Sequence, residues 1–305
     1  MNKQPLVSIV IPVFNGAAFL LEAMESIQKS TYRNFEVLLI DDGSSDMSKE
    51  VCRLLAEKYK NVRFFDFTKN KGLGRVLNFA LKHANGKYIC RLNQDDNMLP
   101  HRLATQVAFL RKNETVVAVG SSIRLFDEHG NKQIVRFLPT DEQIKQVWYI
   151  VSPFADPSVM YRKDVALKAG GYDQDYWPAD DTHLWYRMGM KGKLANIQKP
   201  VVNVRWHDKA ASVFFFRKLA LRTYKMHLWT NQHIKQAPWY IHVYWLCQLI
   251  AGLTLSPQIN WGAYRVMKKI INAYEDRTGR VTKAIKQINV AAVKPHPKKL
   301  SLSGV

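Results

Sequence analysis

Cysteine is scarce in this chain, which has only Cys52, Cys90 and Cys247 among 305 residues. Their spacing matches no metal-binding motif, and an odd number of thiols cannot pair completely. A disulfide scaffold is therefore excluded, and a reducing compartment is favoured. The segment from Met1 to Pro5 runs directly into a strand pattern without the apolar stretch of a secretory signal peptide. We expect no export by that route and a cytoplasmic location.

Two glycine-rich phosphate-binding motifs are also absent. Gly72 and Gly74 lack a third glycine at the required spacing, because Leu77 stands there. No Gly-x-x-x-x-Gly-Lys-Ser/Thr segment occurs. The usual dinucleotide fingerprint and the nucleoside-triphosphate loop are both excluded.

Acidic residues are outnumbered, with 25 Asp and Glu against 45 Lys and Arg, a net charge of +20. The excess is concentrated at the end of the chain, since residues 213–305 hold 15 basic and two acidic residues. Such a basic segment implies an anionic partner, either a membrane surface or nucleic acid. With 47% hydrophobic and 23% charged residues, the chain as a whole is typical of a globular protein.

The first hundred residues alternate between strand and helix patterns. We predict strands at 7–12, 35–40, 62–67 and 87–92, and helices at 18–29, 48–59 and 72–84. This alternation predicts an α/β fold, with a mostly parallel sheet and helices on both of its faces. Beyond it we predict strands at 116–126, 132–137, 158–161 and 194–206, and helices at 141–150, at 163–169 and after Ala179.

A short segment with polar residues follows each of the first four predicted strands: Phe14-Asn15 after Pro12, then Asp41-Asp42, Asn70-Lys71-Gly72 and Asp95-Asp96. Parallel sheets bind ligands beyond the carboxyl ends of their strands. The adjacent carboxylates of Asp95 and Asp96 would suit Mg²⁺, which takes one or two carboxylates and completes its shell with water and phosphate. A solvated turn is the alternative for this pair.

The later polar residues have simple structural alternatives. Asp180 and Asp181 begin a predicted helix, where acidic residues interact favourably with the helix dipole and serve as caps. His207 follows a predicted strand, and a single histidine there is often a surface or packing residue.

Taken together, these segments resemble the family 2 inverting glycosyltransferases, which use nucleotide sugars and have the GT-A fold. The resemblance covers about residues 5–212 and is carried by 7–15, Asp41-Asp42-Gly43-Ser44, Asn70-Lys71-Gly72, 84–89, Asp95-Asp96, Gly170-Gly171-Tyr172-Asp173, Ala179-Asp180-Asp181 and Trp206-His207. One departure lies at Asn93, where the family often has an aspartate. Asn93 is a poorer cation ligand, so we interpret the site as altered and not lost.

The resemblance implies a role for each matching residue. Mg²⁺ or Mn²⁺ would be held first by Asp96, with Asp95 acting through water or the ribose. His207 would contact the metal or the diphosphate, and Asp181 would be the base, with Asp180 beside it. The donor would be bound by Pro12, Phe14 as the stacking residue, Asn15, Asp41 or Asp42 as acceptor for the base, and Lys71 and Arg75 near base or phosphates.

After Ser212 the composition changes to a basic, aromatic-rich helical extension, 213–305, which follows a glycosyltransferase domain at 1–212. Residues 239–255 are mostly apolar, with aromatic residues suited to a headgroup layer. Three alternatives remain: this helix packs on the domain, lies on the inner face of a membrane, or spans it. Residues 292–305 are expected to form a disordered tail.

The resemblance implies transfer of a sugar to a glycan or lipid-linked acceptor in cell-surface polysaccharide synthesis. Two alternatives belong to other classes. A nucleic-acid-binding protein would explain the charge, but no binding motif occurs and we expect no nucleic-acid partner. A nucleotidyltransferase on a similar sheet would also use paired carboxylates and a metal.

Overall fold

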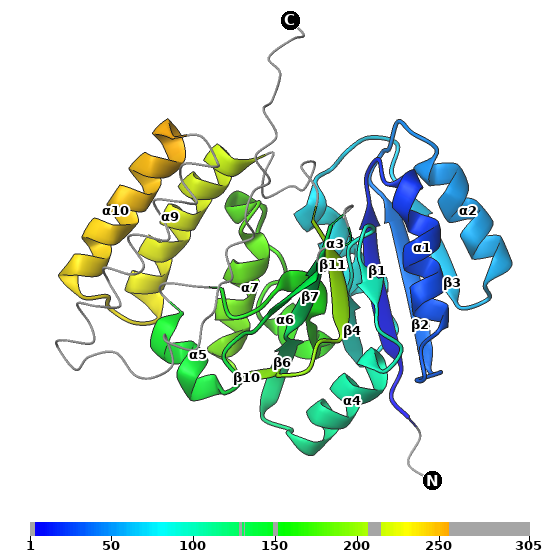
Figure 1. Cartoon of the computed structure of the whole chain (residues 1–305), viewed down its shortest axis with the longest axis horizontal. Coiled ribbons are helices and arrows are strands. Elements are labelled where there is room, and N and C mark those ends of the chain that lie inside the picture. The colour runs from blue at the N-terminus through cyan, green and yellow to red at the C-terminus, as the bar shows by residue number, and fades with distance from the viewer. Residues whose placement is uncertain (1–3, 128–129, 131, 149–151, 207–214, 256–305) are drawn as a thin grey trace, which may run out of the picture.

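The computed structural model describes residues 4–127, 130, 132–148, 152–206 and 215–255 (Figure 1). Its first part alternates as predicted, and every boundary lies within one residue of the expected one. The elements are β1 (Val7–Val13), α1 (Ala17–Gln28), β2 (Phe35–Asp41), α2 (Ser48–Lys58), β3 (Val62–Asp66), α3 (Leu73–His83) and β4 (Tyr88–Arg91). These four strands are parallel and lie in the order β4-β1-β2-β3, so their polar carboxyl ends share one edge.

Three further strands complete a seven-stranded sheet in the order β10-β6-β9-β4-β1-β2-β3. They are β6 (Val116–Ser121), β9 (Met160–Arg162) and β10 (Lys193–Ile197). Strand β9 runs antiparallel to both of its neighbours, β4 and β6, whereas β10 is parallel to β6. The sheet is therefore mostly parallel, as the α/β alternation predicts.

A second, four-stranded sheet has the order β5-β11-β7-β8 and corrects two expectations. Its strands are β5 (Asn97–Met98), β11 (Val202–Arg205), β7 (Ile123–Phe126) and β8 (Lys132–Val135). The single strands predicted at 116–126 and 194–206 each divide between the two sheets. The segments that follow β6 and β10 leave the large sheet at the same place, where the amide of Ser122 donates to the carbonyl of Ile197 (2.9 Å). They pair again as β7 and β11, with Asn203 opposite Arg124.

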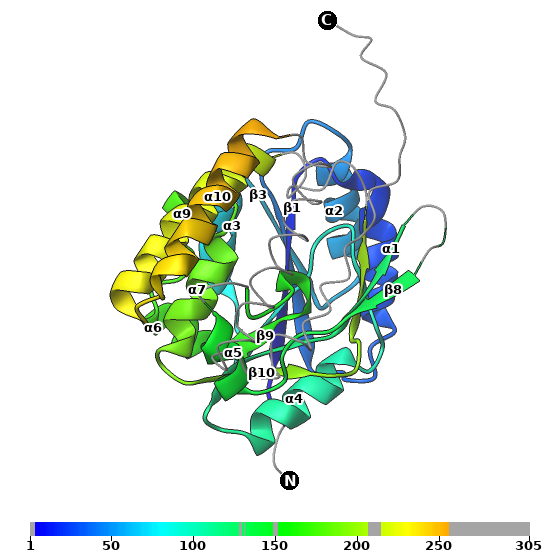
Figure 2. The same ribbon diagram turned by 60° about the vertical axis from the view of Figure 1, so that its left-hand side comes forward.

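Helices cover both faces of the large sheet, as Figures 1 and 2 show. Besides those named above, the helical elements of the body are α4 (Arg102–Lys112), α5 (Asp141–Val147), η1 (Asp156–Ser158), α6 (Lys163–Lys168), η2 (Gln174–Tyr176) and α7 (Asp180–Gly189). Side chains of β1 alternate between the two cores: Ile9 and Ile11 pack with α1, α2 and α4, and Val10 packs with α3 and α7. A strand covered on both faces needs apolar residues throughout, which explains the continuous β-branched run.

Two helices follow the body: α9 (Phe216–His233) and α10 (Trp239–Thr254). Figure 1 places α9 between α7 and α10. Met226, Tyr244 and Trp245 belong to the same buried cluster as Trp185 of α7, so the pair continues the core of the body. Among the described helices, none combines the length and apolar character that crossing a bilayer requires. The expected boundary at 212/213 and the expected tail at 292–305 lie outside the described residues.

Candidate active site at the carboxyl edge of the sheet

The ends of β1 and β2 lie side by side at the carboxyl edge. Val13 pairs with Asp41, and the amide of Asp42 donates to the carbonyl of Val13 (2.8 Å). Pro12 is the penultimate residue of β1. Phe14 comes directly after the strand, and 47% of its surface is exposed. An exposed aromatic ring beside two buried carboxylates is a suitable platform for a planar base.

The loop after β1 is joined to the loop after β4 by a reciprocal pair of hydrogen bonds. The amide of Phe14 donates to Oε1 of Gln94 (2.9 Å), and Nε2 of Gln94 donates to the carbonyl of Phe14 (3.0 Å). Gly16 makes this arrangement possible, because a Cβ there would lie 2.2 Å from Cδ of Gln94. Sequence reasoning missed Gln94, whose role depends on a partner 80 residues away.

Serines of the loop after β2 hold Asn15 and Asp41. Oδ1 of Asn15 accepts from the amide of Ser45 (2.9 Å), and the amide of Asn15 donates to Oγ of Ser44 (3.0 Å). Asp41 accepts from the amide of Ser44 (3.0 Å). Ser44 and Ser45 therefore fix the loop after β1, including Asn15, whose backbone is left-handed (φ 50°).

Asp42 holds the turn that follows β3. Its two carboxylate oxygens accept from the amides of Lys71 (2.7 Å) and Gly72 (2.9 Å). Burial raises the pKa of Asp42 above its usual value, although the two amides lower it. Nζ of Lys71 lies 4.2 Å from the centre of the Phe67 ring, and Arg75 is exposed in the first turn of α3. Three of the four predicted polar clusters thus meet around one rim.

The fourth cluster follows β4, and its two carboxylates differ in environment. Asp96 is 1% exposed, and its oxygens accept from Nδ2 of Asn93 (2.9 Å) and the amide of Arg205 (2.9 Å). Burial and the neighbouring charge of Asp95 raise the pKa of Asp96 to about 8. Asp95 is half-buried. Asp96 therefore fastens the loop to β11, and Asp95 is the more accessible of the two.

Asp180 and Asp181 form the first turn of α7. Asp180 is buried, and burial raises its pKa to about 7. Burial, followed by the charge of Asp156, raises the pKa of Asp181 well above its usual value. Among the described residues, Oδ2 of Asp180 has no hydrogen-bond partner, and a Cβ at Gly74 would lie 3.2 Å from it. The α7 carboxylates thus lie against the first turn of α3, beside the turn held by Asp42.

A buried cation links the two acidic pairs. Arg91, at the end of β4, forms an ion pair with Asp156 (Nε to Oδ2, 3.2 Å). Burial raises the pKa values of Asp96, Asp180 and Asp181, and the charge of Arg91 acts to lower each of them. Arg91 therefore acts electrostatically on both Asp96 and Asp181.

Sequence reasoning passed over both Arg91 and Asp156. A charged residue inside the apolar run that forms β4 was the available signal for Arg91, because such a residue needs a buried partner. Asp156 in the segment 155–158 had no such signal.

The donor set fits a hydrated Mg²⁺ or Mn²⁺ that shares its shell with phosphate. Asp95 supplies an accessible carboxylate at the loop after β4, and such ions commonly take one or two carboxylates from protein when a diphosphate supplies further oxygens. Within the described ranges, no group of three His, Cys, Asp or Glu side chains forms a complete metal cage. His207, the third expected ligand, lies outside the described residues.

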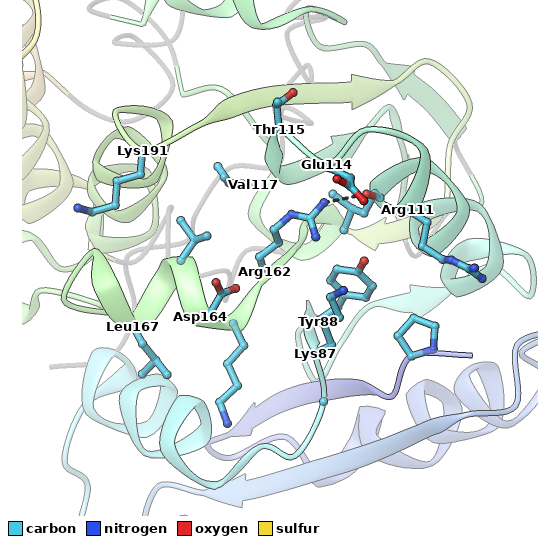
Figure 3. A pocket seen from close by; sticks show the side chains of 15 residues that line it. Lys87, Tyr88, Arg111, Glu114, Thr115, Val117, Arg162, Asp164, Leu167 and Lys191 are labelled. Atoms are coloured by element: carbon cyan, nitrogen blue, oxygen red, sulfur yellow. Dashed lines mark hydrogen bonds between the residues drawn. The ribbon is translucent and has the colours of Figure 1, made fainter. Parts of the chain in front are cut away.

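A cavity of about 1060 Å³ lies at the opposite edge of the sheet (Figure 3). It is lined at the amino ends of β4 and β6 by Lys87, Tyr88 and Thr115, and by Arg162 where the antiparallel β9 ends. None of the predicted site residues that the structure describes lines it. The chemistry-bearing carboxylates therefore lie at the other end of the strands.

Comparison with known proteins decides the family. The sequence profile described as glycosyl transferase family 2 matches residues 8–170. The chain belongs to glycosyltransferase family 2. This enzyme is 32% identical over 209 residues to EpsE of Bacillus subtilis, covering 67% of this chain and 74% of that protein. It is 29% identical over 216 residues to the UDP-Gal:alpha-D-GlcNAc-diphosphoundecaprenol beta-1,3-galactosyltransferase of Escherichia coli, covering 69% and 78%.

Solved structures agree with the fold of this glycosyltransferase. Mannosyltransferase PcManGT of Pyrobaculum calidifontis, in complex with GDP-Man and Mn²⁺, superposes with a TM-score of 0.57 at 20% identity, covering 93% of this chain and 85% of that one. Residues 1–349 of S. aureus TarS, in complex with UDP, give a TM-score of 0.57 at 16% identity, covering 84% and 82%. The GT-A fold expected from the sequence is confirmed.

Proposed function

We propose that this enzyme transfers a hexose from a nucleotide-sugar donor to a lipid-linked glycan acceptor, with inversion, in polysaccharide synthesis. The observation that carries the proposal is the meeting of four loops at one sheet edge, with the aromatic ring of Phe14 and the carboxylates of Asp42, Asp95 and Asp181 around it. The names of the relatives support both substrates, since one relative is named for UDP-Gal and a diphosphoundecaprenol acceptor.

The donor would lie along the loops after β1, β2 and β3. Phe14 stacks on the base, and the rim formed by Pro12, Asn15 and Asp41 surrounds it. Asp42 presents the turn that carries Lys71, and with Arg75 this turn supplies positive charge for the base or the phosphates. The hydrogen bonds of Asp42 to the turn support the position of Lys71.

Asp95 would be the principal ligand of Mg²⁺ or Mn²⁺, with Asp96 positioning the loop and His207 a further ligand. The accessibility of Asp95 and the occupied oxygens of Asp96 support this order, which reverses the one expected from the resemblance. When bound, the cation neutralises charge that develops on the leaving diphosphate.

Asp181 would act as the general base, with Asp180 beside it. As the acceptor hydroxyl attacks the anomeric carbon, its proton moves to the Asp181 carboxylate, and the bond from that carbon to the diphosphate breaks on the opposite face. Attack on the face opposite the leaving group inverts the configuration. The raised pKa of Asp181 supports this role, because a base with a raised pKa binds the proton more strongly.

A lipid-linked acceptor would support a peripheral location of the enzyme at the inner face of the cytoplasmic membrane. We assign residues 1–212 to the catalytic domain and 213–305 to the extension that reaches the membrane. The net charge of +13 over residues 213–305 supports attraction to anionic lipid.

The experiment is a donor screen with Mn²⁺. UDP-, GDP- and dTDP-sugars are incubated with the enzyme and a polyprenyl-diphosphate-linked sugar, and released nucleotide is identified. Release of nucleoside diphosphate together with an extended acceptor is expected. Release of pyrophosphate with transfer of a nucleoside monophosphate would instead show a nucleotidyltransferase. Tight binding to generic DNA at moderate salt, with no sugar transfer, would favour the nucleic-acid-binding alternative.

A further inference from the structure

Helix α10 is apolar on two opposite sides. One side, with Ile241, Tyr244 and Trp245, is buried against the rest of the protein. The other side carries a row of exposed apolar residues, each between 36% and 74% exposed, which we call the outer stripe: Trp239, Val243, Leu246, Ile250 and Leu253. Their spacing of three and four residues places them on one face of the helix, opposite the buried side.

The outer stripe differs from other exposed apolar residues of the protein. Leu21 of α1 and Leu54 of α2 are as exposed, but acidic or basic residues adjoin each of them in the sequence. Helix α10 contains no Asp, Glu, Lys or Arg in its 16 residues. A helix that is apolar all round is normally covered all round, and a continuous exposed patch marks an interaction surface. Figures 1 and 2 show α10 as the outermost described helix on its side of the molecule.

The charge of the segment that carries the outer stripe selects the partner. Residues 213–255 include five basic residues and no acidic one. Lys218 and Lys225 are exposed on the adjoining α9. A two-fold pair of these chains would place the same surface against itself and bring like charges together. An anionic lipid surface offers an apolar layer for the stripe and negative charge that attracts this positively charged segment.

Helix α9 connects this surface to the active site. Nζ of Lys218 lies 4.1 Å from the centre of the Trp177 ring, and Nζ of Lys225 lies 4.6 Å from that of Tyr176. These two aromatic residues precede Asp180 and Asp181 in the chain. The ring of Trp229 also packs edge-on against the ring of His183 in α7, with 4.6 Å between the two ring centres. A partner that bound α9 and α10 would therefore also restrain the segment that precedes the proposed base, Asp181.

We infer that the outer stripe of α10 inserts into the headgroup layer of an anionic bilayer, to which the net positive charge of residues 213–255 attracts the protein. This inference rests on the proposed function in one respect, since a lipid-linked acceptor gives the enzyme a reason to lie there. Trp239 supplies an amphipathic ring of the kind enriched at membrane interfaces.

The test uses the full chain and vesicles of phosphatidylcholine alone or with 30 mol% phosphatidylglycerol, roughly the anionic content that gives a negative surface potential. The wild-type protein is expected to sediment with the anionic vesicles. The variant Leu246→Gln/Ile250→Gln is expected to bind at least about tenfold more weakly, because it removes two inserting side chains. Leu54→Gln on α2 is the matched control and should bind like the wild type.

Three results would overturn the inference. Equal vesicle binding by the double variant and the wild type would remove the stripe from the contact. A concentration-dependent dimer that the double variant abolishes, without vesicle binding, would identify a second copy as the partner. Faster hydrogen exchange of residues 256–305 in the double variant, again without vesicle binding, would identify the end of this chain as the cover.

The proposed function is tested separately in the same samples. The double variant should retain nucleotide binding and sugar transfer to a short-chain, water-soluble acceptor. Loss of vesicle binding with retained transfer supports the membrane surface. Absence of transfer in the wild type, with vesicle binding intact, would reject the proposed function and leave the surface standing.

Discussion

Nε of Arg91 lies 3.2 Å from Oδ2 of Asp156, and both charges are in the interior beneath the carboxylates of α7. An ion pair in this position has lost its hydration, so each charge depends on the other for compensation. The Arg91 side chain also donates from Nη1 to the carbonyl of Leu92 (2.8 Å), which directs it toward the site. The charges of this pair therefore act on the pKa values of the α7 carboxylates in the proposed active site.

Removing either member of this pair should be costly. We expect Arg91→Met and Asp156→Asn each to lower the free energy of unfolding by about 3–5 kcal/mol, because a buried charge is left unpaired. The double variant should lose less than the two single losses together. Urea denaturation of the four proteins measures this coupling, and strictly additive losses would contradict it.

The stability of the protein should fall with rising pH because of Asp180. Its pKa is about 7 in the folded protein, against a reference value of 3.8. Between these two values the folded state binds more protons than the unfolded state, so the free energy of unfolding decreases as pH rises. Asp180→Asn removes this proton uptake. Its stability gain over the wild type should be small near pH 4, grow as pH rises, and level off above pH 7.

The control for this pH effect is Asp164→Asn, which neutralises an exposed carboxylate of α6. Thermal unfolding of the three proteins between pH 4 and 8 makes the comparison. The stability difference between Asp164→Asn and the wild type gives the baseline for neutralising a carboxylate at the surface. A gain for Asp180→Asn that is the same at pH 4 and pH 8 would show that burial does not raise the pKa of Asp180.

The sequence predicted the first half of the fold well because each signal there was local. The β-branched run of β1 and the apolar stripe of α1 require no knowledge of their partners. The second half depended on pairing between distant segments. Nothing within 116–126 indicates that the chain leaves one sheet at Ser122, because the bond that marks the change comes from Ile197.

The candidate site shows the same division. Carboxylates at strand ends could be found from the sequence because topology alone brings such ends together. Their separate roles could not be found, because these depend on long-range hydrogen bonds. Asp95 and Asp96 are adjacent in the chain, yet only Asp96 accepts from the amide of Arg205, 109 residues later.

Asp181→Asn should abolish sugar transfer and leave donor binding intact. The amide cannot accept the proton of the acceptor hydroxyl, and loss of a general base typically lowers a rate by about 10²–10⁴. The affinity for the nucleotide, measured by calorimetry, should stay near the wild-type value. Asp175→Asn, an exposed acid in η2, is the control and should retain activity. Turnover at the wild-type rate in the Asp181 variant would remove that residue from the base role.

The two carboxylates after β4 should respond differently to neutralisation. Asp95→Asn is expected to raise the Mn²⁺ concentration for half-maximal activity by at least about tenfold, as the loss of a metal-supporting group commonly does. Asp96→Asn should change this metal concentration much less, because both oxygens of Asp96 already accept hydrogen bonds from Asn93 and Arg205. A metal titration of each variant, with unfolding temperatures beside it, separates these effects. A metal requirement that changes only in the Asp96 variant would restore Asp96 as the principal ligand.

Gln94 should control nucleotide binding through Phe14. Gln94→Ala removes both hydrogen bonds that join the loops after β1 and β4, and Gly16→Ala displaces the same side chain because a Cβ would overlap Cδ of Gln94. We expect each variant to weaken UDP binding by about tenfold, the effect of one or two hydrogen bonds of about 1 kcal/mol. Gln133→Ala, in the exposed β8, is the control.

The double variant decides whether both substitutions act on this one link. In Gln94→Ala the three atoms nearest to an added Cβ at position 16 are gone, so Gly16→Ala/Gln94→Ala should bind UDP about as well as Gln94→Ala alone. Calorimetric titration of the four proteins with UDP and Mn²⁺ completes the cycle. If the two losses instead multiply, Gly16→Ala disturbs the donor loop by a route other than Gln94, and the reciprocal hydrogen bonds do not set the position of Phe14.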